Sequence, residues 1–373
     1  MVSYVHKTFF GEHMPFQPTI PHNDLPLLPP QVDLETKAVL KACVLAHRAL
    51  AQLVSDCKRL PNSAIFYHRL FLAEAKDSSE IENIITTNDE LYRAAVADAK
   101  ELGGTAKEVL HYVDALWGGT EQMRERNLLT KQTLISIANT INGNTAGVRS
   151  TPGTVLRNRV TGEVIYTPPE GKERLLDLLD DLERYINAES DVDVLVRMAV
   201  IHYQFEAIHP FTDGNGRTGR IANLLFLERQ GVIEHPVLFL SRYILGNRDG
   251  YYAGLRGITE RGEWEAWVAY ILRGVEETSR FMSQKIEEII LARSEMKRRL
   301  RAELPAIYSK DLLDVLFAQP YCRIRDLVVA GIAKRATAST YLHALAEKGL
   351  LDSFKIGREV YFVNPRLFEI LRR

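Results

Sequence analysis

Apolar residues recur with a helical period along most of this chain, and the pattern predicts a mainly α fold. The segment 194–208 is apolar on nearly every face, which is typical of a buried helix. A polar, glycine-rich run then interrupts the pattern, and a helical pattern returns over 220–230. Residues 33–117 contain several further helical patterns, and another helix is expected over 263–274. We therefore expect a helical core built around the segment 194–208.

Short β-rich stretches mark two departures from the helical pattern. The segment 155–168 places them on either side of Thr161-Gly162-Glu163, which predicts a β-hairpin. Near the C-terminal end, three short helical segments precede two strands, which is the order of a winged helix-turn-helix domain. The helical segments are 311–317, 323–329 and 334–348, and the strands are 351–356 and 360–363. The outward positions of the third helix are Arg335, Thr337, Ser339, Thr340 and His343.

These patterns divide the chain into five regions. Residues 1–32 are proline-rich and predict an extended arm that lies on the surface of the protein or on a partner. Residues 33–117 form an N-terminal helical region, and 118–275 form a core that includes the hairpin and the glycine-rich run. Residues 276–304 are charged and helix-favouring with an apolar stripe, which predicts a connecting helix. The winged-helix region occupies 305–373.

The composition is that of an ordinary soluble globular protein, with 46% hydrophobic and 25% charged residues. A net charge of −1 and a pI near 6.8 argue against a chain-wide attraction to nucleic acid or to a membrane surface. Three unclustered cysteines predict a reducing compartment, with neither a disulfide framework nor a zinc site. The N-terminus lacks a signal-peptide pattern, and we expect no apolar run long enough to span a bilayer. A cytoplasmic protein is expected.

The candidate chemistry is concentrated in the run HPFTDGNGRTGR, from His209 to Arg220. Its glycines precede a helix, and the unpaired N–H groups and positive dipole at a helix N-terminus favour an anion. Arg217 and Arg220 lie three residues apart, so both guanidinium groups can reach the same anion. Asp213 is the one carboxylate of the run, and beside a polyphosphate it needs a cation, which indicates Mg²⁺. His209, with a reference pKa of about 6.5, is suited to accept a proton near neutral pH.

This run resembles the motif of the Fic family, HPFx[D/E]GNGRxxR, and matches it at every fixed position. Fic proteins typically move AMP from ATP to a Ser, Thr or Tyr hydroxyl of a protein and release pyrophosphate. The resemblance implies that His209 is the general base and that Asp213 holds Mg²⁺ between the α- and β-phosphates. The implied phosphate-binding residues are Gly214, Asn215, Gly216, Arg217, Thr218, Gly219 and Arg220. The implied fold is a Fic-type helical core with a β-hairpin flap.

A second segment, 71–94, is expected to be helical and carries a pattern that the family uses for inhibition. Ser78, Glu82 and Asn83 match [S/T]xxxE[G/N], with Ser78 and Glu82 one turn apart. The apolar face of this helix is expected to carry Ile81, Ile84 and Ile85. The resemblance implies that Glu82 pairs with Arg220, and an arginine held by a carboxylate cannot also grip a phosphate. We therefore expect an autoinhibited enzyme.

The resemblance also assigns expected roles to two less specific segments. In Fic proteins the hairpin before the motif aligns an extended target segment by strand addition. The corresponding flap residues here are Arg157, Asn158, Arg159 and Val160. The segment 241–255 corresponds to the region that bounds the nucleoside, and its candidate residues are Asn247, Tyr251 and Tyr252. Because aromatic rings suit stacking on adenine, Tyr251 is the first candidate for that contact.

Two classes of function fit the sequence. The first is a protein adenylyltransferase, whose expected partners are ATP, a protein hydroxyl, the enzyme itself as a target, and a second copy in a homodimer. The second is a transcription regulator in which the core senses a nucleotide and the C-terminal domain binds DNA. That domain is only mildly basic, so DNA binding, protein recognition and a structural role all stay open. Within the enzyme class, use of another nucleotide and a second activity that removes AMP also stay open.

Overall fold

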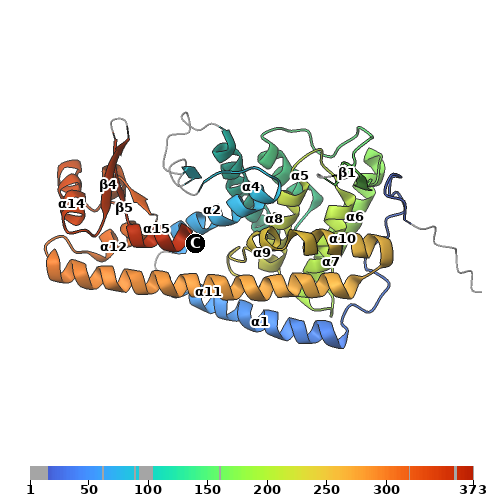
Figure 1. The fold of residues 1–373 in the computed structure, drawn as a ribbon, viewed down its shortest axis with the longest axis horizontal. Helices are drawn as coiled ribbons and strands as arrows, with labels where there is room; N and C mark the ends of the chain where they lie inside the picture. The colour runs from blue at the N-terminus through green and yellow to red at the C-terminus, as the bar shows by residue number, and fades with distance from the viewer. Residues whose placement is uncertain are drawn as a thin grey trace, which may run out of the picture.

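The computed structural model describes residues 16–60, 63–87, 90–91, 104–158, 161–318, 320–356 and 359–372. Helices dominate this part of the chain, as the apolar pattern predicts (Figure 1). The helices before the hairpin are α1 (Lys37–Cys57), α2 (Ser63–Ile81), α4 (Gly104–Arg126) and α5 (Lys131–Asn142). The hairpin consists of β1 (Leu156–Arg157) and β2 (Val164–Tyr166). The helices that follow it are α6 (Lys172–Asn187), α7 (Val194–Ile208), α8 (Asn215–Arg229), α9 (Leu240–Gly246), α10 (Arg248–Arg261) and α11 (Trp264–Glu303).

Helices α7 and α8 form the centre of the core, and they pack against each other on either side of the glycine-rich run. Nearly every residue of α7 is buried, because its sequence is apolar on all faces and only the interior can accommodate such a helix. Helices α6 and α11 pack on α7, while α4 and α5 pack on α8. The glycine-rich run is thereby attached at both ends to the most deeply buried elements of the molecule.

Helix α11 is a single helix of 40 residues, so it joins the helix expected over 263–274 to the connecting helix expected over 276–304. Gly274 lies at this junction inside the continuous helix, where it allows α9 to pack closely against α11. A Cβ at Gly274 would lie 2.7 Å from side-chain atoms of Leu240 and Tyr243, so only glycine lets α9 approach this closely. At about 1.5 Å per residue, α11 spans on the order of 60 Å from the core to the C-terminal domain (Figure 1).

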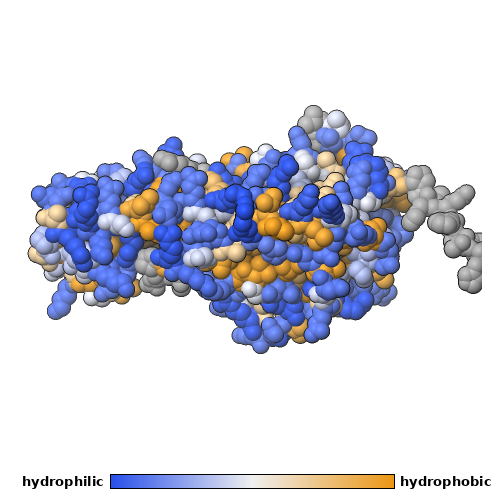
Figure 2. All heavy atoms as spheres, turned by 90° about the horizontal axis from the view of Figure 1, so that it is seen from below, coloured by the Kyte–Doolittle hydropathy of each residue, from blue (hydrophilic) through white to orange (hydrophobic). Residues whose placement is uncertain are grey.

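Helix α1 packs along α11 through an apolar face that includes Val39, Leu50 and Leu53. By length and composition α1 qualifies as a candidate membrane span, and 33% of its most apolar window is buried in the structure. This finding corrects the expectation that the chain holds no apolar run of such length. The outer face of α1 exposes Leu40 and Val44, and Figure 2 shows apolar residues gathered over this side of the molecule.

The described part of the N-terminal arm lies on the core, as its proline content predicts. Leu25 is buried, and the backbone N–H of His22 donates to the carbonyl of Thr167 at 3.0 Å. Further along, the N–H of Leu28 donates to a carboxylate oxygen of Asp181 at 2.8 Å. The arm is therefore held by hydrogen bonds to its own chain.

The C-terminal region contains the three helices and the two-stranded hairpin that the sequence predicts, together with one additional strand and one additional helix. Its elements are α12 (Lys310–Ala318), β3 (Tyr321–Cys322), α13 (Ile324–Val329), α14 (Arg335–Glu347), β4 (Asp352–Ile356), β5 (Glu359–Val363) and α15 (Pro365–Arg372). The three strands form an antiparallel sheet in the order β3-β5-β4. Of the predicted outward positions on α14, Arg335, Thr337, Thr340 and His343 are exposed, and Ser339 is half-buried.

Candidate functional site

His209 ends α7 in a backbone conformation that few residues adopt. Its φ of 48° and ψ of 57° lie in the left-handed region, and its N–H donates to the carbonyl of Phe205 at 3.1 Å. Such a conformation in a non-glycine residue is strained and is typical of functional sites. Burial, followed by the nearby charge of Arg149, lowers the pKa of His209 to about 4. At neutral pH this pKa leaves the imidazole unprotonated, as a general base must be, and makes it a weaker base than a histidine with an ordinary pKa.

Arg149 holds this turn in place, although no local sequence pattern marks it as a site residue. Its Nε donates to the carbonyl of His209 at 2.9 Å, and its backbone N–H donates to the carbonyl of Pro210 at 3.0 Å. A third donor of Arg149 reaches the carbonyl of Pro169, just after the hairpin, at 2.5 Å. Arg149 is only 5% exposed, so one buried side chain ties the histidine turn to the base of the hairpin.

The glycine-rich run closes on itself before α8 begins. The side-chain amide of Asn215 accepts from the N–H of Phe211 at 2.8 Å and donates to the carbonyl of Phe211 at 2.7 Å. Both ends of this amide thus make a positioning contact within the loop, and a phosphate contact by Asn215 stays a prediction. Gly214, with a φ of 77°, is the N-cap of α8 and provides no side-chain hydrogen bond. The first-turn N–H groups of α8 therefore have no side-chain cap and are suited to bind an anion.

Asp213 and Arg217 lie at the mouth of this helix N-terminus. The Asp213 side chain is 78% exposed, and its carboxylate lies 3.6 Å from the buried guanidinium of Arg217. The Nε of Arg217 and the hydroxyl of Thr218 are buried without a hydrogen-bond partner among the described residues. No cluster of three metal-ligating side chains exists in the part of the chain that the structure describes. One exposed carboxylate fits Mg²⁺ nonetheless, because Mg²⁺ is commonly held by one or two carboxylates together with substrate phosphates.

Arg220 is held by the C-terminal end of α2. Its Nε donates to the hydroxyl of Ser78 at 2.8 Å, and one NH₂ group donates to the Ser78 carbonyl at 2.8 Å and to a Glu82 carboxylate oxygen at 3.1 Å. Burial opposes the charge of Arg220, but Glu82 together with Tyr251, Glu206 and Tyr112 outweighs it and raises the pKa of the guanidinium above its usual range. The structure thus brings together Ser78, Glu82 and Arg220 as the sequence predicts.

Asn83 explains why the pattern ends in glycine or asparagine. Its φ of 65° is left-handed, the conformation that glycine and asparagine adopt most readily at the end of a helix. The N–H of Asn83 donates to the Glu80 carbonyl, and the N–H of Ile84 donates to the Ser79 carbonyl, both at 3.0 Å. This Schellman motif ends α2 at Ile81, so the expectation that Ile84 and Ile85 continue its apolar face is wrong.

The Glu82 carboxylate occupies the space directly over Gly216. A Cβ at Gly216 would lie 2.3 Å from Glu82 Oε1 and 2.8 Å from a terminal nitrogen of Arg220. Gly216 belongs to the first turn of α8, where an anion is stabilised by free N–H groups and by the helix dipole. Glu82 is therefore an anion of the same chain that lies where a phosphate group is predicted.

Two carboxyl groups near Arg220, the buried Glu74 and the half-buried Glu206, carry no local sequence signal. Burial raises the pKa of Glu206 to about 7, and its Oε1 has no hydrogen-bond partner among the described residues. Burial also raises the pKa of Glu74 to about 8, and Glu74 accepts hydrogen bonds from Ser241 and from the hydroxyl of Tyr112. Both residues belong to ordinary helical patterns, so only the fold shows that they surround Arg220.

The candidate nucleoside residues lie in different environments. Tyr251 is 3% exposed, and its hydroxyl bonds to Nε2 of His202 at 2.9 Å while its ring packs on Trp267. This is a core position, so the ring of Tyr251 is not presented for stacking on adenine. Tyr252 and Asn247 are exposed, and a nucleoside contact by these two residues stays a prediction.

The hairpin has the antiparallel pairing that the sequence predicts, with Leu156 opposite Tyr166 and Arg157 opposite Val164. The Tyr166 hydroxyl donates to the carbonyl of Ala207 at 2.8 Å, which fixes the hairpin to α7 two residues before His209. Arg157 and Asn158 are exposed at its tip. The other two predicted flap residues, Arg159 and Val160, lie outside the described residues.

Family comparisons agree with this geometry. Residues 128–227 match the Fic/DOC family model, and residues 40–121 match the model of the Fic/DOC family N-terminal region. This chain carries the Fic/DOC domain and the N-terminal region of that family. Residues 293–367 match a third model, described as the C-terminal domain of SoFic-like protein adenylyltransferase. The three matches include the α2 end, the motif run and most of the C-terminal region.

Individual relatives of this Fic/DOC chain are similar over shorter segments. Protein adenylyltransferase fic-1 of Caenorhabditis elegans is 34% identical over 107 residues, which cover 28% of this chain and 20% of that relative. Protein adenylyltransferase Fic of Drosophila melanogaster is 30% identical over 141 residues, which cover 35% of this chain and 27% of that relative. This chain therefore matches only about a quarter of the length of these curated relatives.

The solved structures extend the likeness to the whole fold. A Fic family protein from Desulfovibrio desulfuricans G20 has a TM-score of 0.55 at 18% sequence identity, with 90% of this chain and 98% of that chain covered. Residues 134–508 of Fic-1 from Caenorhabditis elegans give a TM-score of 0.50 at 20% identity, with 67% and 74% covered. At such identities the likeness establishes the Fic fold alone.

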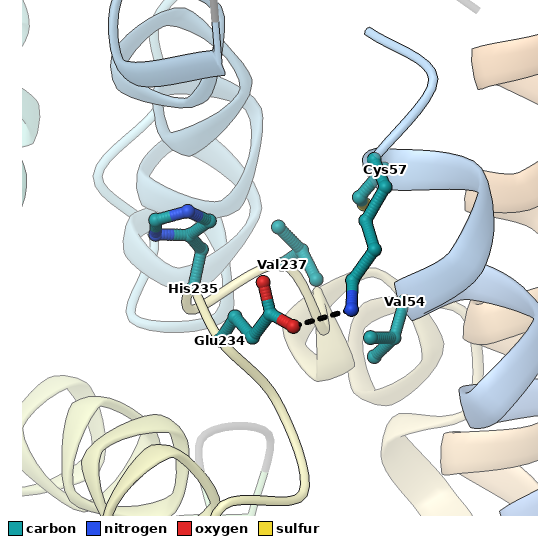
Figure 3. A pocket seen from close by; sticks show the side chains of 6 residues that line it. Val54, Cys57, Glu234, His235 and Val237 are labelled. Carbon is teal, nitrogen blue, oxygen red and sulfur yellow. Dashed lines mark ion pairs between the residues drawn. The ribbon is translucent and has the colours of Figure 1, made fainter.

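A shallow surface pocket of about 210 Å³ lies away from the Fic motif, and no motif residue lines it (Figure 3). It lies between the end of α1 and the loop before α9, where Lys58 and Glu234 form an ion pair at 2.5 Å. The candidate site of this Fic/DOC protein is therefore the histidine turn and the uncapped N-terminus of α8.

Proposed function

We propose that this protein is an autoinhibited protein adenylyltransferase, which transfers AMP from ATP to a hydroxyl group of a protein and releases pyrophosphate. One observation carries the proposal. A neutral, strained histidine stands beside an uncapped helix N-terminus, and the arginine of that helix is held by a carboxylate of the same chain. A nucleotide-sensing regulator would need the anion cradle but no neutral base beside it.

His209 performs the proton transfer in this proposal. Its neutral imidazole takes the proton of the target hydroxyl, and the hydroxyl oxygen then attacks the α-phosphorus of ATP. The bond from that phosphorus to the bridging oxygen breaks, and pyrophosphate leaves with the bonding electrons. Arg149 contributes indirectly, because it fixes the carbonyl of His209 and therefore the direction of the ring. A positioned base typically contributes about 10²–10⁴-fold to the rate.

The N-terminus of α8 holds the phosphates. Its free N–H groups and dipole attract the anion, and Arg217 and Arg220 neutralise the charge of the β- and γ-phosphates. Asp213 would hold Mg²⁺, which supplies further neutralisation of the phosphate charge when bound. The chain thus contributes mainly positioning and charge, which is what phosphoryl and nucleotidyl transfer require.

Glu82 inhibits by occupying the γ-phosphate position. Its carboxylate bonds to Arg220 and lies over Gly216, so the γ-phosphate of ATP would meet a negative charge and lose a guanidinium partner. ATP then binds without the alignment that transfer needs. Movement of the α2 end away from Arg220 restores that alignment.

The hairpin supplies a place for the target protein. Its tip is exposed and its base is fixed to α7 just before His209, so an extended segment added to the hairpin edge would pass the histidine. A Ser, Thr or Tyr side chain on that segment would present its hydroxyl to the base. A segment of a second copy of this protein would serve equally, which gives self-modification.

The test is transfer of label from ATP to protein in the presence of Mg²⁺. We expect slow labelling of the wild type and faster labelling of Glu82→Gly, and we expect the label to disappear in Glu82→Gly combined with His209→Ala. Glu80→Gln is a matched control, because the Glu80 carboxylate pairs with Lys76 on the same helix and does not contact Arg220. Mass spectrometry identifies the transferred group and the modified residue. An unlabelled Glu82→Gly protein that binds DNA in an ATP-dependent way would support the regulator instead.

A further inference from the structure

The C-terminal end of α2 receives two arginine side chains from other helices. The last four carbonyls of a helix have no partner within it and need donors from elsewhere. The Ser78 carbonyl accepts from Arg220 at 2.8 Å, and the Glu80 carbonyl accepts from Arg248 at 2.7 Å. Positive groups at this end also oppose the negative pole of the helix dipole. Arg220 belongs to the motif, whereas Arg248 lies outside it and contacts α2 two residues before Glu82.

The surroundings of Arg248 favour its contact with the Glu80 carbonyl. It is the first residue of α10 and is half-buried, and its Nε is buried without a hydrogen-bond partner among the described residues. A charged donor and a helix-end carbonyl form a stronger hydrogen bond than a neutral pair. Because the Glu80 carbonyl also accepts from the N–H of Asn83, Arg248 supports the turn that sets the direction of Glu82.

A second contact holds α2 further from its end. Glu74 is buried one turn before Ser78 and accepts hydrogen bonds from the hydroxyl and the N–H of Ser241, near the start of α9. The segment from α9 to α10 therefore donates hydrogen bonds to α2 at two positions, Glu74 and Glu80. The Glu74 contact is fully buried, whereas the Arg248 contact is partly exposed, so the Glu80 end is the one that can release without disturbing the core.

We propose that Arg248 is a positioning residue for inhibition, which holds the Glu80 carbonyl so that Glu82 reaches Arg220. The inference rests on the proposed function, since the effect on labelling requires that Glu82 inhibits AMP transfer. Arg220 is itself predicted to bind phosphate, so its replacement cannot separate inhibition from transfer. Arg248 contacts the inhibitory helix without belonging to the motif, and its replacement can separate them.

The experiment compares Arg248→Ala and Arg248→Lys with the wild type and with Glu82→Gly in the ATP labelling assay. We expect Arg248→Ala to label about tenfold faster than wild type and more slowly than Glu82→Gly, and Arg248→Lys to lie between wild type and Arg248→Ala. Arg256→Ala is the matched control, because Arg256 lies on the same helix and pairs with Glu260 at 2.6 Å. Adding Arg248→Ala to Glu82→Gly should give no further increase, because the carboxylate that Arg248 positions is already gone.

Hydrogen exchange at residues 79–84 provides a second readout that does not depend on activity. These amides should exchange faster than in the wild type in Arg248→Ala and at the wild-type rate in Arg256→Ala. Unchanged exchange together with unchanged labelling would overturn the role of Arg248. So would an inactive Arg248→Ala in the presence of an active Glu82→Gly, since Arg248 would then serve the transfer itself. An inactive Glu82→Gly would refute the proposed function, and the exchange result would still decide whether Arg248 holds α2. If Arg248→Ala fails to fold, Arg248→Lys carries both measurements.

Discussion

The motif run and the end of α2 meet at Arg220, yet they are attached to the molecule in different ways. The motif run lies between two buried helices, and Asn215, Arg217 and Arg220 are each at most 3% exposed. The end of α2 lies nearer the surface, with the Glu82 side chain 30% exposed and Ile85 67% exposed. The motif run is enclosed within the core, whereas the end of α2 packs against the core and is partly exposed.

Because of this difference, we expect the motif run to keep one conformation and the end of α2 to detach reversibly. The motif run cannot rearrange without opening the core, so its geometry is maintained whether or not the protein is active. The end of α2 is held by buried hydrogen bonds to Ser78 and by partly exposed ones to Glu80 and Glu82, and the partly exposed contacts can open at lower free energy than global unfolding. The proposed inhibition can therefore be relieved while the geometry of the motif run stays intact.

The largest effect should come from removing the base in the permanent region. In the Glu82→Gly background, His209→Ala should lower the labelling rate by about 10²–10⁴-fold, because transfer then lacks a positioned proton acceptor. Thermal unfolding should change little, which distinguishes lost chemistry from lost structure. A decrease below tenfold would mean that His209 is not the base.

The next effect tests whether the permanence of the motif run depends on Arg149. Arg149→Met removes donors from the carbonyls of His209 and Pro169, and each buried unpaired carbonyl costs about 1–3 kcal/mol. The free energy of unfolding should fall by at least about 1 kcal/mol. The kcat of the Glu82→Gly enzyme should fall about tenfold, with a smaller change in KM for ATP. A lowered stability with unchanged kcat would limit Arg149 to a structural role.

A smaller effect concerns the reversible region. Asparagine tolerates the left-handed conformation through local side-chain hydrogen bonds and alanine does not, so Asn83→Ala should cost about 1–2 kcal/mol, whereas glycine adopts this conformation without strain. Misdirection of Glu82 should increase labelling several-fold in Asn83→Ala and leave it unchanged in Asn83→Gly. Neither replacement should matter once Glu82 is glycine. Equal activities of the alanine and glycine variants would refute the role of this turn.

The smallest effect is in the pH dependence of the transfer step. The lowered pKa keeps His209 neutral down to about pH 4, and activity that depends on this base is lost as the pH falls through that value. The rate should therefore change little between pH 8 and pH 6, whereas a histidine with an ordinary pKa would lose about fourfold. The pH–rate profile of Glu82→Gly measures this. Comparison with Glu206→Gln assigns any inflection near pH 7, where Glu206 titrates.

Local patterns were sufficient for part of the site. The glycine-rich run, the hairpin and the Ser78–Glu82 spacing are each contained within a short stretch of sequence, and the structure places all three as expected. The contacts that hold them are not local. Arg149 and His209 are 60 residues apart, and Arg248 and Glu80 are 168 apart, so no pattern along the chain could pair them. Tyr251 shows the opposite error, because an aromatic residue on a helix looks the same in a core as in a ligand site.

The position of α2 has a mechanical consequence. At one end the helix carries Glu82, and along its length it also packs against α12, the first helix of the C-terminal domain (Figure 1). Close-packed helices transmit displacement instead of absorbing it. A displacement of the C-terminal domain would thus act on α2, the helix that contacts Arg220, through α12 and not through the motif run. The 40-residue α11 forms the rigid strut against which that displacement is exerted.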